Sequence, residues 1–254
     1  MIYGDYHTHT TYSHGKGSVE ENVLAARARG LKEIAVTDHG LRHILYKLKR
    51  KHIARLRAEV DALNAKYSDI RVLMGIEANL IGRGGVLDLT AEEARLFDIV
   101  LAGYHITVRA QNCREQHRFL IGNFLAHNIW GYSKSRVKSN TRAYIQAIEK
   151  NPIAVVTHIN FRIKADAAEV AKAARDHGTL IEISGKRTGC TDDEICAMAA
   201  TGAQFILSSD AHRTQKVGDV AFAEDILART GIPYTQVANW DKRPVFRTPK
   251  GEGL

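Results

Sequence analysis

Cysteine and proline are scarce in this 254-residue sequence, and long apolar runs are absent. The three cysteines, Cys113, Cys190 and Cys196, are too few and too scattered for a disulfide framework or a C-x-x-C zinc site. A reducing, cytoplasmic location is therefore expected. No run of about 18 apolar residues occurs, which excludes a membrane-spanning helix. The first residues also lack the basic start and apolar stretch of a secretory signal, so we expect no membrane partner.

The four prolines are accompanied by no Gly/Ser-rich linker and no shift in composition, so we expect a single domain over residues 1–254. With 44% hydrophobic and 25% charged residues, the chain can bury a core and is unlike a disordered protein. Its 36 Lys and Arg residues exceed its 28 Asp and Glu residues, giving a net charge of +8. This charge favours an anionic partner without distinguishing a small phosphate ester from nucleic acid. The sequence makes no prediction about oligomeric state.

Short apolar runs rich in β-branched residues alternate with longer amphipathic stretches, a pattern that indicates repeated βα units. The first predicted helix has Ser18 as its N-cap, with Glu21 three residues on, and ends at Gly30. Seven consecutive βα units favour a barrel-like α/β domain over an open doubly wound sheet. We predict strands at residues 2–6, 33–37, 71–76, 99–104, 153–157, 179–183 and 204–208, and further helices at 41–66, 165–177, 192–200 and 217–229.

Histidine is unusually frequent, with twelve residues, and many of them follow predicted strands. In a barrel the carboxyl ends of the strands converge on one face, so residues far apart in sequence would meet there. For five other histidines we expect ordinary loop or helix roles, least firmly for His43, which closely follows Asp38-His39-Gly40; they are His43, His52, His117, His127 and His177. The residues at or near strand ends are His7, His9, His14, His39, Glu77, His105, His158, Asp210 and His212.

The motifs around these residues resemble, in order, the signature of the polymerase and histidinol phosphatase (PHP) superfamily, and most closely its short stand-alone phosphatases. The resemblance extends over nearly the whole chain. It implies a distorted seven-stranded (β/α)7 barrel related to the TIM barrel, with nine residues binding three metal ions. The motifs are His7-Thr8-His9 with His14, Thr37-Asp38-His39-Gly40, Gly75-Ile76-Glu77-Ala78-Asn79, Gly103-Tyr104-His105, Thr157-His158 and Ser209-Asp210-Ala211-His212.

The resemblance also implies how the ligands are shared: His7, His9, Glu77 and Asp210 for one metal, Glu77, His105 and His158 for a second, and His14, His39 and His212 for a third. Glu77, Asp210 and His212 are expected to be catalytic as well. Imidazoles with a few carboxylates suit zinc, manganese or iron. Two features depart from the family pattern and bear on substrate identity: Ile159-Asn160 replaces a frequent proline, and a long segment follows His105.

Three divalent ions with two carboxylates and a hydroxide leave a strongly electropositive cavity, which selects phosphate. A carboxylate such as Glu77 can hold two metals about 3.5 to 4 Å apart, close enough to share the attacking hydroxide. The predicted sixth strand carries no ligand and is followed by Lys186 and Arg187. Either they bind phosphate oxygens or they form a solvated basic turn, and Arg162 and Arg213 compete for the phosphate-binding role.

Two other segments receive less specific interpretations. Residues 82–85, Gly-Arg-Gly-Gly, are predicted to form a β-turn rather than a phosphate loop, because no helix or G-K-[ST] follows. In the insertion at residues 105–152, Lys134, Arg136 and Lys138 lie near Trp130 and Tyr132. Such a mixture can bind single-stranded nucleic acid. We expect a solvated loop, with a cap over the substrate as the alternative.

Three functions are compatible with these residues. The first is a metal-dependent phosphoesterase that hydrolyses a small phosphate monoester, histidinol phosphate being one family example, through a hydroxide that bridges metals of a trinuclear centre. The second is a nucleotide or nucleic-acid phosphoesterase, since PHP domains also occur as exonucleases attached to DNA polymerases. The third is a metal-stabilised scaffold without turnover, against which the complete ligand set argues. We expect the first, with a small phosphorylated substrate as partner.

Overall fold

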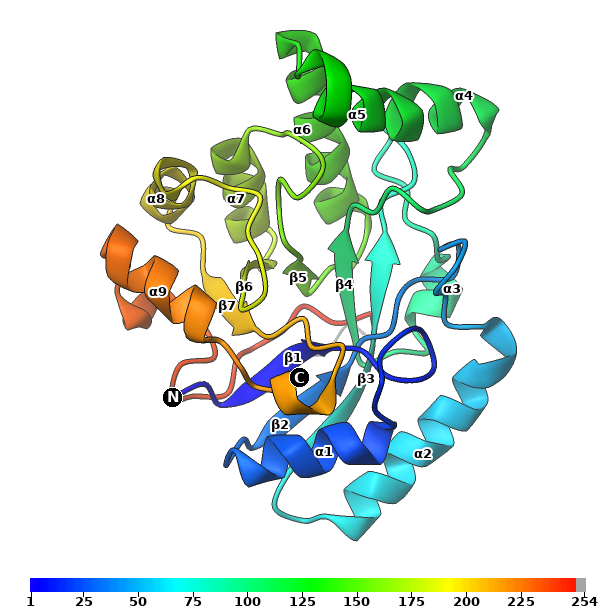
Figure 1. Cartoon of the computed structure of the whole chain (residues 1–254), viewed down its shortest axis with the longest axis vertical. Coiled ribbons are helices and arrows are strands. Elements are labelled where there is room, and N and C mark those ends of the chain that lie inside the picture. The colour runs from blue at the N-terminus through cyan, green and yellow to red at the C-terminus, as the bar shows by residue number, and fades with distance from the viewer. Residues whose placement is uncertain (250–254) are drawn as a thin grey trace.

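Seven parallel strands form one sheet in the order β1 to β7 in the computed structural model, which describes residues 1–249. This arrangement confirms the predicted barrel of βα units. Figure 1 shows β3 and β4 running side by side toward the α4–α5 end of the molecule. The strands are β1 (Gly4–Thr8), β2 (Glu33–Val36), β3 (Arg71–Asn79), β4 (Ile99–Gly103), β5 (Val155–Val156), β6 (Leu180–Ser184) and β7 (Phe205–Ser208).

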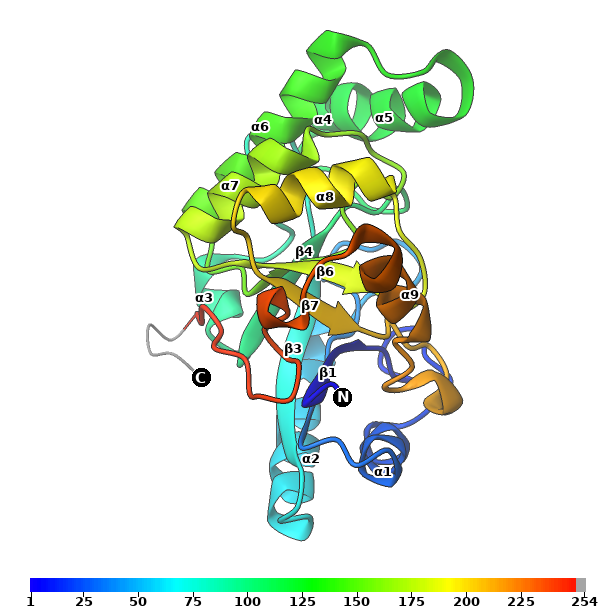
Figure 2. The ribbon, with the colours of Figure 1, turned by 90° about the vertical axis from the view of Figure 1, so that its left-hand side faces the viewer.

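The helices pack around this sheet (Figures 1 and 2). The predicted start of α1 is confirmed, because Ser18 accepts a hydrogen bond from the Glu21 backbone and the Glu21 side chain accepts one from the Ser18 backbone. No described helix is long and apolar enough to cross a membrane. The helices are α1 (Val19–Ala28), α2 (Ile53–Lys66), α3 (Ala91–Ala94), α4 (Cys113–Glu115), α5 (Gly122–Leu125), α6 (Lys134–Lys150), α7 (Ala167–Asp176), α8 (Asp192–Ala200) and α9 (Ala221–Thr230).

The barrel is nearly closed, and it closes at the carboxyl ends of β1 and β7. Thr8 and Ala211 form an isolated parallel bridge. The His9 amide donates to the Ala211 carbonyl at 2.8 Å, and the Ala211 amide donates to the His7 carbonyl at 3.3 Å. Because no longer ladder joins β1 to β7 in the described residues, the barrel is distorted in the way the family resemblance implies.

Apolar side chains fill one end of the barrel interior. The rings of Tyr6 and Phe246 meet there edge to face, with centroids 4.9 Å apart. Leu73 belongs to the same buried cluster. Side chains two or four residues apart on a strand lie on the same face. Glu77 therefore follows Leu73 on the inner face of β3, so an ionisable layer lies next to the apolar one.

The predicted start positions of two helices are wrong. Residues 41–52 are not part of α2, since Ile44 donates its amide to the Thr107 carbonyl and Leu48 donates to the His39 carbonyl, both at 2.8 Å. These bonds join loops at the site rather than successive helical turns. Helix α9 likewise begins at Ala221, because Gly218 adopts a positive φ of 72° that an α-helix does not accommodate.

The insertion at residues 105–152 is mostly helical, so the expected solvated loop is wrong. Wide π-helical turns at Gln116–Ile121 and Ala126–Trp130 join α4 and α5 into one run, and Lys134 begins α6. Helix α6 buries Tyr144 and Ala147 at helical spacing, a pattern that the basic residues on its other faces obscured. The turn predicted at residues 82–85 is confirmed by the Gly85 amide, which donates to the Gly82 carbonyl.

The side chain that α2 buries in the core gives a test of this fold. Leu56 is fully buried, whereas Leu24 on α1 is 43% exposed. Replacement of Leu56 by Ala should lower the free energy of unfolding by about 2 to 5 kcal/mol, since it removes buried methyl groups and leaves a cavity. Replacement of Leu24 by Ala should change it by less than about 0.5 kcal/mol. Urea denaturation measures both, and equal losses would contradict the described packing.

Candidate metal centre

The structure brings all nine predicted ligand residues together at the carboxyl ends of the strands. Two of them lie within strands rather than after them, because His7 is the fourth residue of β1 and β3 extends to Asn79, beyond Glu77. The other seven lie in the loops that follow β1, β2, β4, β5 and β7. All are buried except His14, His105 and His212, which are partly exposed.

The carboxylate of Glu77 is at the centre of the cluster and is completely buried. Its Oε1 lies 2.8 Å from His158 Nε2, 3.4 Å from His7 Nε2 and 3.6 Å from His105 Nε2. Its Oε2 lies 2.9 Å from His39 Nδ1 and 3.7 Å from His9 Nε2. A carboxylate in contact with five imidazoles has the position required of a ligand shared between metal ions.

Two further groupings surround this carboxylate. His7 Nε2 and His9 Nε2 are 3.1 Å apart, and they lie 3.8 and 3.3 Å from Asp210 Oδ1. His9 also groups with His39 and His212, whose ligand atoms lie within 4.8 Å of one another. His14 stacks on His39 with ring centroids 4.8 Å apart, so it borders this second group.

Burial keeps several of these imidazoles neutral. Burial, together with His212 and His39, lowers the pKa of His14 to about 3, and burial lowers the pKa of His212 to about 4. The neutral imidazole is the form that binds a metal ion. His7 differs, because the carboxylates of Glu182 and Glu77 outweigh its burial and hold its pKa well above the usual value.

The donor set fits divalent transition metals. Six buried side-chain atoms form no hydrogen bond of good geometry among the described residues, and four belong to this cluster: Glu77 Oε2, His9 Nδ1, His14 Nδ1 and His39 Nδ1. Glu77 Oε2 and His39 Nδ1 are only 2.9 Å apart, but they are not aligned as donor and acceptor. Unpaired buried polar atoms are rare in proteins and cost about 1 to 3 kcal/mol each. Bound zinc, manganese or iron would explain why such atoms are concentrated among imidazoles and carboxylates.

The backbone is strained at two of the predicted ligands. His158 and Asp210 have positive φ values of 26° and 50°, which non-glycine residues rarely adopt. Such conformations cost about 1 to 3 kcal/mol each and cluster at functional sites. Gly103 leaves the room that His158 needs, because a Cβ at position 103 would lie 2.9 Å from His158 Cε1 and 2.3 Å from Thr157 Oγ1.

The sequence analysis missed Glu182, a buried carboxylate on β6. Its Oε1 lies 2.7 Å from His7 Nδ1, and its Oε2 accepts a hydrogen bond of 2.8 Å from the His158 amide. The first contact turns His7 Nε2 toward Glu77, and the second holds the strained His158 backbone. The available signal was a charged residue between Ile181 and Ile183 in a strand expected to be buried, where an unpaired charge is costly.

Six of the nine clustered residues form the floor of a hollow of about 260 Å³: His14, His39, His105, His158, Asp210 and His212. His43 lies in its wall but is not placed as a ligand, since its Nδ1 accepts the Tyr46 amide at 3.0 Å and its Nε2 lies 2.8 Å from Thr107 Oγ1. The ordinary role expected of His43 stays a prediction, and the residue borders the site. Within the described residues, the other four histidines with expected ordinary roles do not line the hollow.

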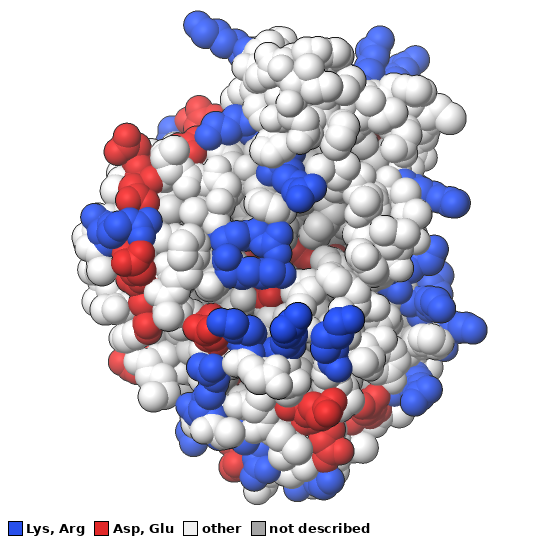
Figure 3. Space-filling view, viewed as in Figure 1, with Lys and Arg blue, Asp and Glu red and all other residues white. Residues whose placement is uncertain are grey.

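Basic residues gather around the hollow (Figure 3). Lys186 Nζ lies 3.2 Å from Asp210 Oδ2 and 2.9 Å from His212 Nδ1. Arg187 also approaches Asp210 Oδ2, at 3.5 Å. Three of the four predicted phosphate anchors, Lys186, Arg187 and Arg162, line this hollow, whereas Arg213 lines an adjoining one that shares Lys186, Asp210 and His212.

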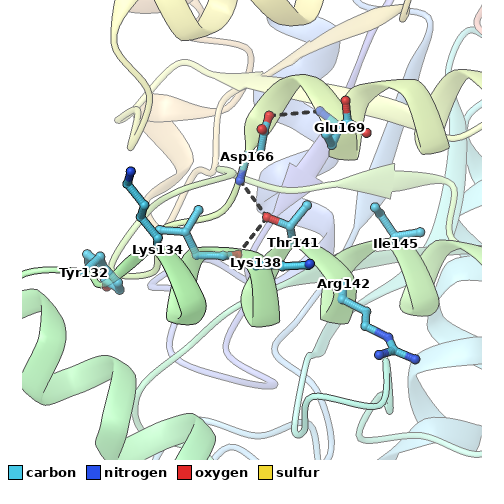
Figure 4. A pocket seen from close by; sticks show the side chains of 9 residues that line it. Tyr132, Lys134, Lys138, Thr141, Arg142, Ile145, Asp166 and Glu169 are labelled. Carbon is cyan, nitrogen blue, oxygen red and sulfur yellow. Dashed lines mark hydrogen bonds between the residues drawn. The ribbon is translucent and has the colours of Figure 1, made fainter.

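A larger hollow of about 560 Å³ lies away from these residues, along α6 and the start of α7 (Figure 4). Two of its polar residues, Thr141 and Asp166, connect the two helices. Thr141 Oγ1 accepts the Asp166 amide at 2.8 Å and donates to the Val137 carbonyl, and Asp166 accepts the Glu169 amide. None of the nine clustered residues lines it, so size alone does not identify the functional site.

Comparisons with known proteins agree with this geometry. The family model described as PHP domain matches residues 5–192. A protein of Shewanella frigidimarina named "Probable phosphatase" is 28% identical over 92% of this chain and 88% of its own length. A protein of the same name from Syntrophotalea carbinolica is 30% identical over 92% of this chain and 90% of its own length.

The chain belongs to the PHP family, and it is a metal-dependent phosphoesterase of that family. The fold agrees with this membership. The crystal structure of the histidinol phosphate phosphatase of Lactococcus lactis, complexed with zinc, L-histidinol and phosphate, superposes with a TM-score of 0.60 at 14% sequence identity. The match covers 98% of this chain and 97% of that one.

The contacts of Glu182 generate a prediction. Glu182→Gln keeps the side-chain shape but removes the negative charge opposite His7 Nδ1, so we expect metal affinity to fall about 10- to 100-fold. Competition with a chelator followed by elemental analysis measures the affinity, and circular dichroism tests the fold. Glu169→Gln is the matched control, because Glu169 is an exposed carboxylate paired with Lys172. Unchanged metal affinity in Glu182→Gln would contradict the orienting role.

Proposed function

We propose that this chain hydrolyses a small phosphate monoester at a centre of three divalent transition-metal ions. The nine clustered residues would hold the ions, with Glu77 shared between them. The observation that carries the proposal is the position of Glu77, whose carboxylate contacts imidazoles from β1 and from the loops after β1, β2, β4 and β5. The PHP membership of the chain and the names of its relatives support the same conclusion.

The size and charge of the hollow indicate the substrate. A volume of about 260 Å³ suits a small metabolite rather than a polymer. Its floor is acidic and histidine-rich, and its rim is basic, which suits a phosphate group that faces metal ions on one side and cations on the other. Tyr46, Ile106 and Phe161 line the remaining wall, and they supply apolar contacts for the rest of the substrate.

The chain's own residues would then position the phosphate. When bound, divalent ions supply Lewis acidity and lower the pKa of the attacking water. Arg187 and Arg162 lie over the ring of Phe161, with guanidinium carbons 4.6 and 5.3 Å from its centroid. This contact holds two fork-shaped donors at the rim, where each can bind phosphate oxygens bidentately. Lys186 is closer to the ligands, where its positive charge would balance the carboxylate of Asp210.

Metal content and hydrolysis test the proposal together. After anaerobic reconstitution with zinc, manganese and iron in turn, elemental analysis should find about three ions per chain. Hydrolysis of an aryl phosphate monoester should be lost on chelation and restored by metal. Glu77→Ala should lose more metal than His14→Ala, because Glu77 contacts five imidazoles and His14 lies at the edge of the cluster. Metal content near zero would overturn the centre, and equal losses would overturn the sharing by Glu77.

Arg187 provides a separate prediction. Arg187→Ala should lower kcat/KM for the aryl phosphate about tenfold or more, as expected for a charge-assisted contact of about 1.5 to 3 kcal/mol. Metal content should be unchanged, because Arg187 contacts Asp210 only at 3.5 Å. The control is Arg142→Ala on α6, which lines the larger hollow and not the metal-centre hollow. A larger loss in Arg213→Ala than in Arg187→Ala would assign the anchor to the adjoining hollow.

A panel of substrates distinguishes this function from a nucleic-acid phosphoesterase. Small phosphate monoesters, including histidinol phosphate, should be hydrolysed faster than an oligonucleotide of any length. Faster degradation of the oligonucleotide, with an affinity that falls steeply with salt, would replace the proposal by the nucleic-acid activity. Full metal loading without hydrolysis of any phosphate ester would replace the proposal by the third function, a metal-stabilised scaffold without turnover.

A further inference from the structure

Most of the net positive charge of the chain is concentrated in one part of the insertion. Residues 105–142 contain seven Lys or Arg and one Asp or Glu, a surplus of six charges in a chain whose total is +8. The single acid, Glu115, is paired with Arg83 at 2.7 Å. Arg118, Lys134 and Lys138 form no salt bridge within residues 1–249 and are exposed. This segment therefore presents uncompensated positive charge to the solvent.

The same segment exposes large apolar side chains. Ile121 and Phe124 are 39% and 42% exposed, and Ile129 and Trp130 are 66% and 70% exposed. They belong to the helical run from Cys113 to Trp130, whose other face is buried through Phe119 and Leu120. The buried face packs on the barrel, where Phe119 meets Tyr104 edge to face. The exposed apolar face has no partner among the described residues.

The position of this helical run leaves it accessible to a broad surface. In Figures 1 and 2, α4 and α5 form one end of the long axis of the molecule. From the insertion, only His105, Ile106 and Thr107 line the metal-centre hollow, and none of residues 108–131 does. The run therefore does not cover that hollow in this structure, and contact at this end leaves the hollow open.

We propose that the helical run from Cys113 to Trp130, together with the start of α6, docks on an anionic lipid surface. A helix that combines basic residues with exposed Ile, Phe and Trp lies in the boundary between lipid headgroups and acyl chains. Cations beside it are attracted by anionic headgroups. The absence of a spanning helix concerns insertion across a bilayer and does not oppose contact with its surface.

The charge argues against a second copy of the chain as the occupant. A symmetric contact would place the same basic segments opposite each other, which like-charge repulsion disfavours. The aliphatic side chains argue against nucleic acid. Bases stack on aromatic rings, but Ile121 and Ile129 offer no ring and no charge. Both side chains fit the apolar boundary of a bilayer. This inference does not depend on the substrate proposed for the metal centre.

Vesicle sedimentation with the metal-loaded full chain tests the proposal. The protein should sediment with vesicles of phosphatidylcholine and phosphatidylglycerol and remain in solution with phosphatidylcholine alone. Tryptophan emission should shift to shorter wavelength on binding, because Trp130 is exposed in the free protein whereas the other tryptophan, Trp240, is already partly buried. Arg118→Glu combined with Lys138→Glu should weaken binding about tenfold or more, because each charge contributes to the attraction. Ile129→Ser should weaken it about fivefold or more, and hydrolysis of an aryl phosphate should persist in both variants.

The matched control is Phe222→Ser on α9, which removes an apolar side chain that is 39% exposed elsewhere on the surface. It should bind vesicles as the unmodified chain does. No preference for phosphatidylglycerol, or the same loss in Phe222→Ser as in Ile129→Ser, would overturn the proposal. A dimer in sedimentation velocity that Ile129→Ser abolishes, without vesicle binding, would replace the lipid surface by a second copy. Tighter binding of a single-stranded oligonucleotide, without vesicle binding, would replace it by nucleic acid.

Discussion

The burial of the Glu77 carboxylate constrains the rest of the site. A fully buried charge is costly unless other groups pair with it and donate hydrogen bonds to it. Among the described residues, imidazoles do this, together with the Thr157 hydroxyl, which donates to Oε1 at 3.1 Å. These imidazoles come from β1 and from the loops after β1, β2, β4 and β5, and the curvature of the sheet brings them to the one carboxylate on β3. The electrostatic requirement of one carboxylate and the topology of the barrel therefore depend on each other.

Other buried carboxylates fix the loops around Glu77. Asp5 accepts the Ser209 amide at 3.0 Å beside Asp210, and Asp38 accepts the Thr10 amide at 2.8 Å beside His9. Burial raises the pKa of both aspartates, and neither forms a salt bridge in the described part of the chain. They accept hydrogen bonds from backbone amides instead, since loop amides that are buried away from water need acceptors. The ligand loops are thus held by hydrogen bonds that exist without metal.

Among the candidate ligands, His14 entered only through the family resemblance. The strands and the other candidate ligands were predictable because both follow from local rules: β-branched runs form strands, and functional residues of barrels lie where strands end. The same rules missed Glu182, which lies inside a strand and acts through two other residues. They failed for residues 41–52, whose amides bond to other loops, and for residues 113–130, whose helical run is fixed by packing on Tyr104. In each case the deciding contact is distant in sequence, so no short window of sequence contains it.

The closure of the barrel between β1 and β7 makes the site dependent on the completion of folding. The hydrogen bond from Ser209 to Asp5 joins residues 204 positions apart. His7 and Asp210 can meet only after all the intervening βα units have formed, and contacts of such high sequence separation form slowly. Metal ions held by both residues, as proposed above, would bind the closed barrel and not its partly folded precursors. Their binding free energy would therefore stabilise the finished fold, with the barrel closed.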